Sequence, residues 1–126
     1  MIHIRPEIKG ILPSDKVKLS FQNETLRPIL KALNDHLLIL VREYFGSVHF
    51  DLERVEDSKL KQQIDTLLLK ESSIKFSVLG MVMGQMSHEE YATYFENSKS
   101  YNKRIWSMAA KRIFDGLKAT SKEETN

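Results

Sequence analysis

Apolar residues recur at intervals of three and four along most of the chain, the spacing that places side chains on one face of a helix. The first stripe predicts a helix over residues 25–45, ended by Gly46 in a left-handed conformation. Further stripes predict helices over residues 51–69 or 57–69, 74–86, from residue 88 onward, and 99–118. The fold class expected is therefore all-α, a bundle of four to five helices with an extended N-terminal arm.

The first 22 residues do not follow the helical pattern. Two prolines and a glycine interrupt the segment, and Val17, Leu19 and Phe21 alternate with polar residues at a period of two. We predict an arm that lies on the bundle, or a short strand with a partner elsewhere. The chain is thus divided into an N-terminal arm (1–22), a helical domain (23–118) and a flexible tail (119–126).

The segment 74–86 is apolar on nearly all sides, which is typical of a helix at the centre of a bundle. Ser72 and Ser73 predict a break between this helix and the preceding one. Gly80 and Gly84 are four residues apart and share a face. Because glycine inside a helix costs about 1 kcal/mol relative to alanine, we expect these two to allow the close approach of another backbone.

Ser87 followed by Glu90 is the clearest local signal in the sequence. A serine with glutamate three residues later forms a capping box, in which each side chain accepts a hydrogen bond from the backbone N–H of the other residue. A new helix is therefore predicted to begin at His88. Asn97 and Ser98 predict its end, before the last helix begins.

Length and charge narrow the classes of function only a little. A chain of 126 residues is long enough for one domain with its own core. The net charge of +2 predicts no strong general attraction to nucleic acid or to anionic membranes. No segment has the length and apolarity of a signal peptide or of a membrane span, so we expect a cytoplasmic protein that does not bind membranes.

No catalytic or metal-binding motif stands out. The chain has no cysteine, and no two of its four histidines are three or four residues apart, as a helical metal site would require. A phosphate-binding loop and a dinucleotide fingerprint are also absent from the sequence, because no Lys-Ser/Thr pair follows Gly84. We expect no metal, no cofactor and, on balance, no enzymatic activity.

The first hypothesis is therefore a non-catalytic interaction protein that forms a homodimer. Its basis is the surplus of apolar and aromatic side chains after residue 87, together with an arm that needs a surface to lie on.

A second hypothesis is a nucleic-acid-binding domain. The order of capping box, short helix, break and longer helix resembles a helix-turn-helix of the sigma-factor or response-regulator kind. Glu96 and Asn102 depart from that pattern, because they replace the glycine of the turn and a buried apolar residue. The residues that would contact phosphates are Lys99, Lys103, Arg104, Lys111 and Arg112.

A third hypothesis is a small-ligand binder or enzyme with a pocket near Gly84. Its candidate lining residues are Arg27, His36, Gly84 and Gln85. His36 lies beside several leucines, where it either makes one hydrogen bond on the flank of the helix or lines a pocket with Arg27 or Asn34.

Several motifs together resemble a group of small helical proteins from the Bacteroidetes, some of which are labelled glyoxalases. The motifs are Thr25-Leu26-Arg27-Pro28, Gly80 to Gly84, Ser87-His88-Glu89-Glu90-Tyr91 and Asn102-Lys103-Arg104. This resemblance implies no established activity and transfers no functional residue. The glyoxalase label conflicts with the sequence, because the chain has neither the strands of a type I fold nor the clustered histidines of a type II metal site.

Overall fold

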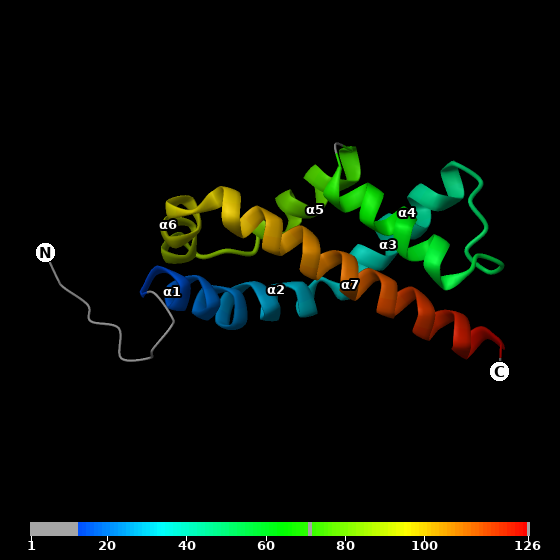
Figure 1. Ribbon diagram of the computed structural model, residues 1–126, viewed down its shortest axis with the longest axis horizontal. Helices are drawn as coiled ribbons and strands as arrows, with labels where there is room; N and C mark the ends of the chain where they lie inside the picture. The colour runs from blue at the N-terminus through cyan, green and yellow to red at the C-terminus, as the bar shows by residue number, and fades with distance from the viewer. Residues whose placement is uncertain (1–12, 71, 126) are drawn as a thin grey trace, which may run out of the picture.

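The computed structural model describes residues 13–70 and 72–125, and within them the regular structure is entirely helical (Figure 1). The all-α prediction is confirmed for this part of the chain. In order, the elements are α1 (Pro13–Phe21), a π-helical turn η1 (Gln22–Leu26), α2 (Arg27–Ala32), α3 (Asn34–Ser47), α4 (Asp57–Leu69), α5 (Ser73–Met83), α6 (His88–Glu96) and α7 (Ser98–Thr125).

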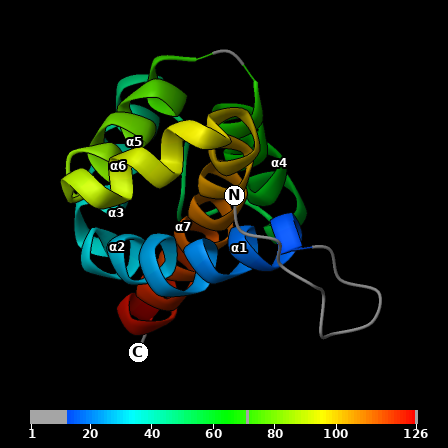
Figure 2. The same cartoon turned by 90° about the vertical axis from the view of Figure 1, so that its left-hand side faces the viewer.

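The centre of the molecule is α7. It packs against η1, α2, α3, α4, α5 and α6, and Figure 2 shows it running through the middle of the other helices. Its buried residues are Tyr101, Ile105, Ala109, Ala110, Ile113 and Leu117. The prediction that segment 74–86 is central is therefore wrong. Although α5 is apolar on most sides, it buries only Ile74, Val78 and Val82.

The extended arm or strand predicted for the residues up to 22 is also wrong where the structure describes them. Residues 13–21 form α1, and of the three alternating apolar residues only Phe21 is buried, while Val17 and Leu19 are 51% and 49% exposed. Phe21 packs against Tyr101 of α7, with 4.6 Å between ring centroids. Residues 1–12 of the predicted arm lie outside the described part of the chain.

The π-helical turn explains how α1 joins the helix that follows it. Phe21 and the next buried residue, Leu26, are five positions apart, which is one more than an α-helical turn accommodates on one face. In η1 the hydrogen bonds span five residues, so that both side chains reach the same core. The alternation of apolar and polar residues before Phe21 predicted an extended arm or a strand, so the five-residue interval to Leu26 was not recognised as helical.

The helix predicted over 25–45 is divided at Leu33, where the backbone departs from helical angles (φ −90°, ψ 3°) between α2 and α3. Beyond this bend, α3 lies very close to α7. A Cβ added at Gly116 of α7 would come within 2.9 Å of both terminal carbons of Leu38. Glycine at this position therefore allows the two helices to approach each other.

The connection after α3 corrects two further predictions. Gly46 lies inside the helix, and the left-handed residue is His49, with φ of 58°. Phe50 then folds back, since its N–H donates to the carbonyl of Phe45 and the two rings are 4.9 Å apart. The next helix begins at Asp57, the later of the two predicted starts.

The predicted break before α5 is confirmed. The Ser72 hydroxyl accepts a hydrogen bond from the backbone N–H of Lys75 and so caps the helix. Lys75 also joins α5 to α7 in two ways. Its carbonyl accepts a hydrogen bond from the Trp106 indole (2.9 Å), and its ammonium lies 4.1 Å from the centre of that ring.

The capping box at the start of α6 is confirmed. The Ser87 hydroxyl accepts from the N–H of Glu90 (3.2 Å), and the Glu90 carboxylate accepts from the N–H of Ser87 (2.9 Å). Beyond the break at Asn97, the buried Tyr94 hydroxyl donates to the side-chain oxygen of Asn102, which ties α6 to the first turn of α7.

The last helix is longer than predicted. Instead of ending at residue 118, α7 continues to Thr125, so the segment predicted as a tail is helical as far as that residue. Lysine, glutamate and alanine in this segment are good helix formers, which favours the continuation of the helix. Among the helices in the described ranges, none is both long enough and apolar enough to cross a membrane.

The capping box gives a direct test of local stability. We expect Ser87→Ala to lower the free energy of unfolding by about 1 kcal/mol, because the N–H of Glu90 loses its acceptor. Urea denaturation followed by circular dichroism measures the change. Ser107→Ala, at an exposed position within α7, is the matched control and should leave stability unchanged or slightly higher. Equal losses in the two variants would contradict the assigned role of Ser87.

The buried tyrosines predict a loss of stability in alkali. Burial raises the pKa of Tyr94 above its ordinary 10.0, and burial together with the negative charge of Glu96 raises the pKa of Tyr101. Above about pH 10 the unfolded chain releases these protons more readily than the folded chain, so the free energy of unfolding falls as pH rises.

Urea titrations from about pH 8 to about pH 11 measure this dependence. The double variant Tyr94→Phe/Tyr101→Phe should show a shallower fall above about pH 10 than the parent protein. If the free energy of unfolding falls equally steeply with pH in the double variant, groups other than these two tyrosines cause the loss of stability in alkali.

Candidate functional site

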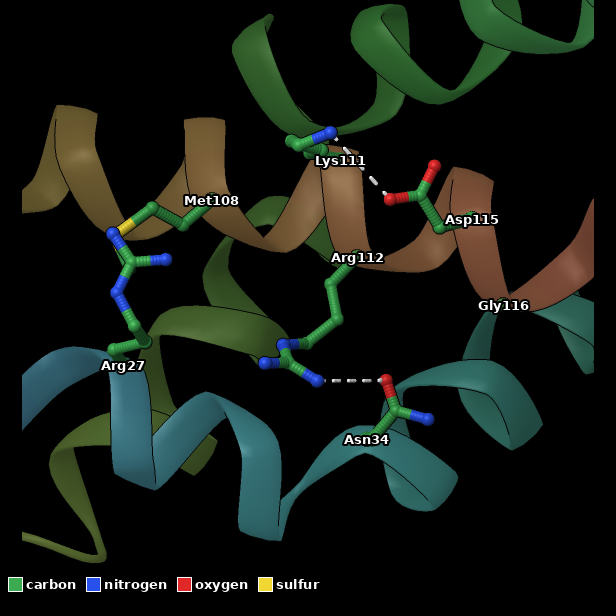
Figure 3. Close-up of a pocket in the computed structure, with 7 residues that line it drawn as sticks. All are labelled: Arg27, Asn34, Met108, Lys111, Arg112, Asp115 and Gly116. Atoms are coloured by element: carbon green, nitrogen blue, oxygen red, sulfur yellow. Dashed lines mark hydrogen bonds and ion pairs between the residues drawn. The ribbon is translucent and has the colours of Figure 1, made fainter.

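A groove lies between α7 and the α2–α3 segment, with a cavity volume of about 390 Å³. Figure 3 shows its walls, to which α7 contributes most of the side chains and α2 and α3 contribute one each. This volume is in the range of small-molecule sites in proteins. The lining residues are Arg27, Asn34, Met108, Lys111, Arg112, Asp115 and Gly116.

Arg112 crosses the groove from the α7 side. Its half-buried side chain extends toward α3, and one guanidinium nitrogen donates to the side-chain oxygen of Asn34 at 3.5 Å (Figure 3). Asn34 is the first residue of α3, so the bend at Leu33 places it opposite Arg112. The asparagine oxygen orients the guanidinium but does not neutralise its charge.

Arg27 enters the same groove from the opposite wall. It is the first residue of α2, and its side chain extends toward Met108 of α7 (Figure 3). Its guanidinium donates to the side-chain oxygen of Asn23, one turn earlier, at 3.3 Å. Within the described residues, neither Arg27 nor Arg112 forms an ion pair with a carboxylate. Both walls of the groove thus carry an uncompensated positive charge.

The other charges of the groove are paired. Lys111 and Asp115 form an ion pair at 3.6 Å along the exposed side of α7. A second hollow of about 660 Å³ shares this pair and extends over α4, where Lys61 and Asp65 are also paired at 3.6 Å. The net positive charge is therefore concentrated between Arg27 and Arg112.

The structure brings together only part of the predicted ligand site. Arg27 lines the groove with Asn34, whereas His36 is exposed on α3 and does not line it. Gly84 and Gln85 are exposed at the end of α5 and line neither hollow. The pocket near Gly84 therefore stays a prediction, while Arg27 lines both of the hollows described here.

The predicted nucleic-acid residues are also divided. Lys111 and Arg112 line the groove, while Lys99, Lys103 and Arg104 are exposed nearer the start of α7. The half-buried Asn102, which the helix-turn-helix pattern did not explain, accepts the hydrogen bond from Tyr94. The sequence alone did not single out Asp115 or Gly116, because only the packing of α7 against α3 makes them part of a site.

No group of three or more histidine, aspartate or glutamate side chains that could hold a metal ion occurs among the residues that the structure describes.

A separate feature is the uncovered face of α5. Phe76 is 53% exposed on this face. Its ring is nearly perpendicular to that of Trp106, with 6.4 Å between the ring centroids. One turn later, Gly80 is exposed, and a Cβ added there would meet nothing within 4 Å. The expected close approach to Gly80 is thus not made by any helix described in this chain. A Cβ added at Gly84 would meet the backbone carbonyls of Gly80 and Met81, at 3.3 and 3.6 Å.

Comparisons with protein-family models, with curated proteins and with solved structures give no match for this chain. A function is therefore assigned from the geometry of the two surfaces described above.

Proposed function

We propose that the protein is a non-catalytic interaction protein that self-associates through the uncovered face of α5. The observation that carries this proposal is the position of a protruding aromatic ring, Phe76, one helical turn from the open space at Gly80. Residues four apart in a helix lie on the same face, so the protrusion and the open space are neighbours.

A second copy of the chain fits this face better than an unrelated partner does. In an antiparallel pair of α5 helices, Phe76 of each copy lies over Gly80 of the other. This reciprocal contact is what a two-fold symmetric interface requires. Ser73 and Ser77 are also exposed on α5 and add little bulk, so the helix axes can approach within about 8–10 Å.

The proposal also accounts for the composition of α5. A helix with apolar residues on most sides is stable in water when most of those sides are covered. Within one copy, the core buries Ile74, Val78 and Val82, and Leu79, Met81 and Met83 pack partly buried against it, whereas Phe76 is 53% exposed. A second copy would cover Phe76, and Gly80, the glycine inside α5, would then have a packing role.

Gly80→Leu tests the proposal, because the new side chain enters open space in a single copy but occupies the position of the partner's Phe76. We expect the parent protein to sediment as a concentration-dependent dimer and Gly80→Leu to sediment as a monomer. Gly46→Leu is the matched control, since Gly46 is also exposed, helical and without neighbours within 4 Å of an added Cβ. This variant should dimerise like the parent.

A second readout uses the single tryptophan, which contacts Phe76. Dilution of the parent protein through its dissociation range should change the emission of Trp106, and Gly80→Leu should show no such change. A parent protein that stays monomeric at high concentration would disprove self-association. If Gly46→Leu weakens the dimer as much as Gly80→Leu does, the interface is not on α5.

A further inference from the structure

We propose that the groove between α2, α3 and α7 binds a small phosphate-bearing molecule, with the phosphate held between Arg27 and Arg112. The two guanidinium groups enter the same cavity from opposite walls. This site is separate from the α5 face and does not depend on self-association.

The hydrogen bonds of the two arginines favour an anionic ligand. Each guanidinium has five N–H donors, and each makes one described hydrogen bond to an asparagine oxygen, Asn23 for Arg27 and Asn34 for Arg112. These acceptors are neutral, so they leave the positive charge of both side chains uncompensated. Most donors of both groups are thus available to a ligand.

Phosphate fits this arrangement better than carboxylate does. A planar carboxylate is satisfied by one guanidinium in a bidentate pair, whereas a phosphate has three peripheral oxygens and a charge close to −2. Two guanidinium groups on facing walls match that charge and that number of acceptors. Lys111 is less suited to this role because it already pairs with Asp115.

The rest of the ligand would lie against the apolar part of the groove. Met108 lines the cavity next to Arg27, and its flexible thioether adapts to ligands of different shapes. Gly116 lines the other end of the groove, where Leu38 of α3 packs against it. A volume of about 390 Å³ accommodates a small phosphorylated molecule rather than a polymer.

Titration calorimetry with inorganic pyrophosphate, at constant ionic strength, tests the proposal. We expect saturable binding that Arg27→Gln or Arg112→Gln weakens at least about tenfold, as the loss of a charge-assisted hydrogen bond predicts. Lys103→Gln removes the same charge from α7 outside the groove and should leave the affinity nearly unchanged.

Asn34→Asp separates binding from folding. The new carboxylate would pair with Arg112 and lies in the first turn of α3, where negative charge is favourable. We expect this variant to lose pyrophosphate binding while its thermal unfolding temperature stays the same or rises. Retained binding in Asn34→Asp would overturn the proposal.

Three further outcomes would also overturn it. One is that pyrophosphate binds no more tightly than chloride does, and another is that Lys103→Gln and Arg112→Gln weaken its binding equally. The third outcome is tight binding of a duplex DNA oligonucleotide that depends on Lys99, Lys103 and Arg104 as well as on the groove. That result would assign the positive charge of α7 to a nucleic-acid interface.

Discussion

The burial of α7 on several sides is the constraint on which the rest of this structure depends. A helix with neighbours on several sides needs side chains of different sizes, because these sizes set how closely each neighbour can pack. Tyr101 packs beside Phe21 of α1, Ala109 and Ala110 are small, and Gly116 allows the close approach of α3. The groove follows from this arrangement, since it forms where α2 and α3 bend around α7 and Arg112 occupies the space between them.

Local signals in the sequence predicted local structure well. The capping box at Ser87, the break at Ser72 and the end of a helix before Ser98 depend on side chains within three or four residues of the backbone that they cap or interrupt. The prediction that α5 is the central helix was wrong for a related reason. The apolar content of a helix indicates that its side chains avoid water, but it does not indicate which helix of a bundle is the central one. An interface with a second chain can also account for a helix of high apolar content.

Features that depend on distant parts of the chain were not predictable in the same way. Arg112 and Asn34 are 78 positions apart, so no spacing rule relates them. The five-residue interval from Phe21 to Leu26 becomes meaningful only once Phe21 is known to pack on Tyr101. The α7 residues that line the groove with Arg27 were not predicted as its neighbours, because α7 is far from Arg27 in the sequence.

The position of α7 in the chain has a consequence for how the protein is made. Ribosomes release the chain from its N-terminus, so the helices α2 to α6 leave the ribosome before α7, against which they pack. Until the residues after Ser98 have emerged, buried side chains such as Leu37, Ile64 and Val78 lack the surface that covers them. The core therefore cannot close before α7 has left the ribosome.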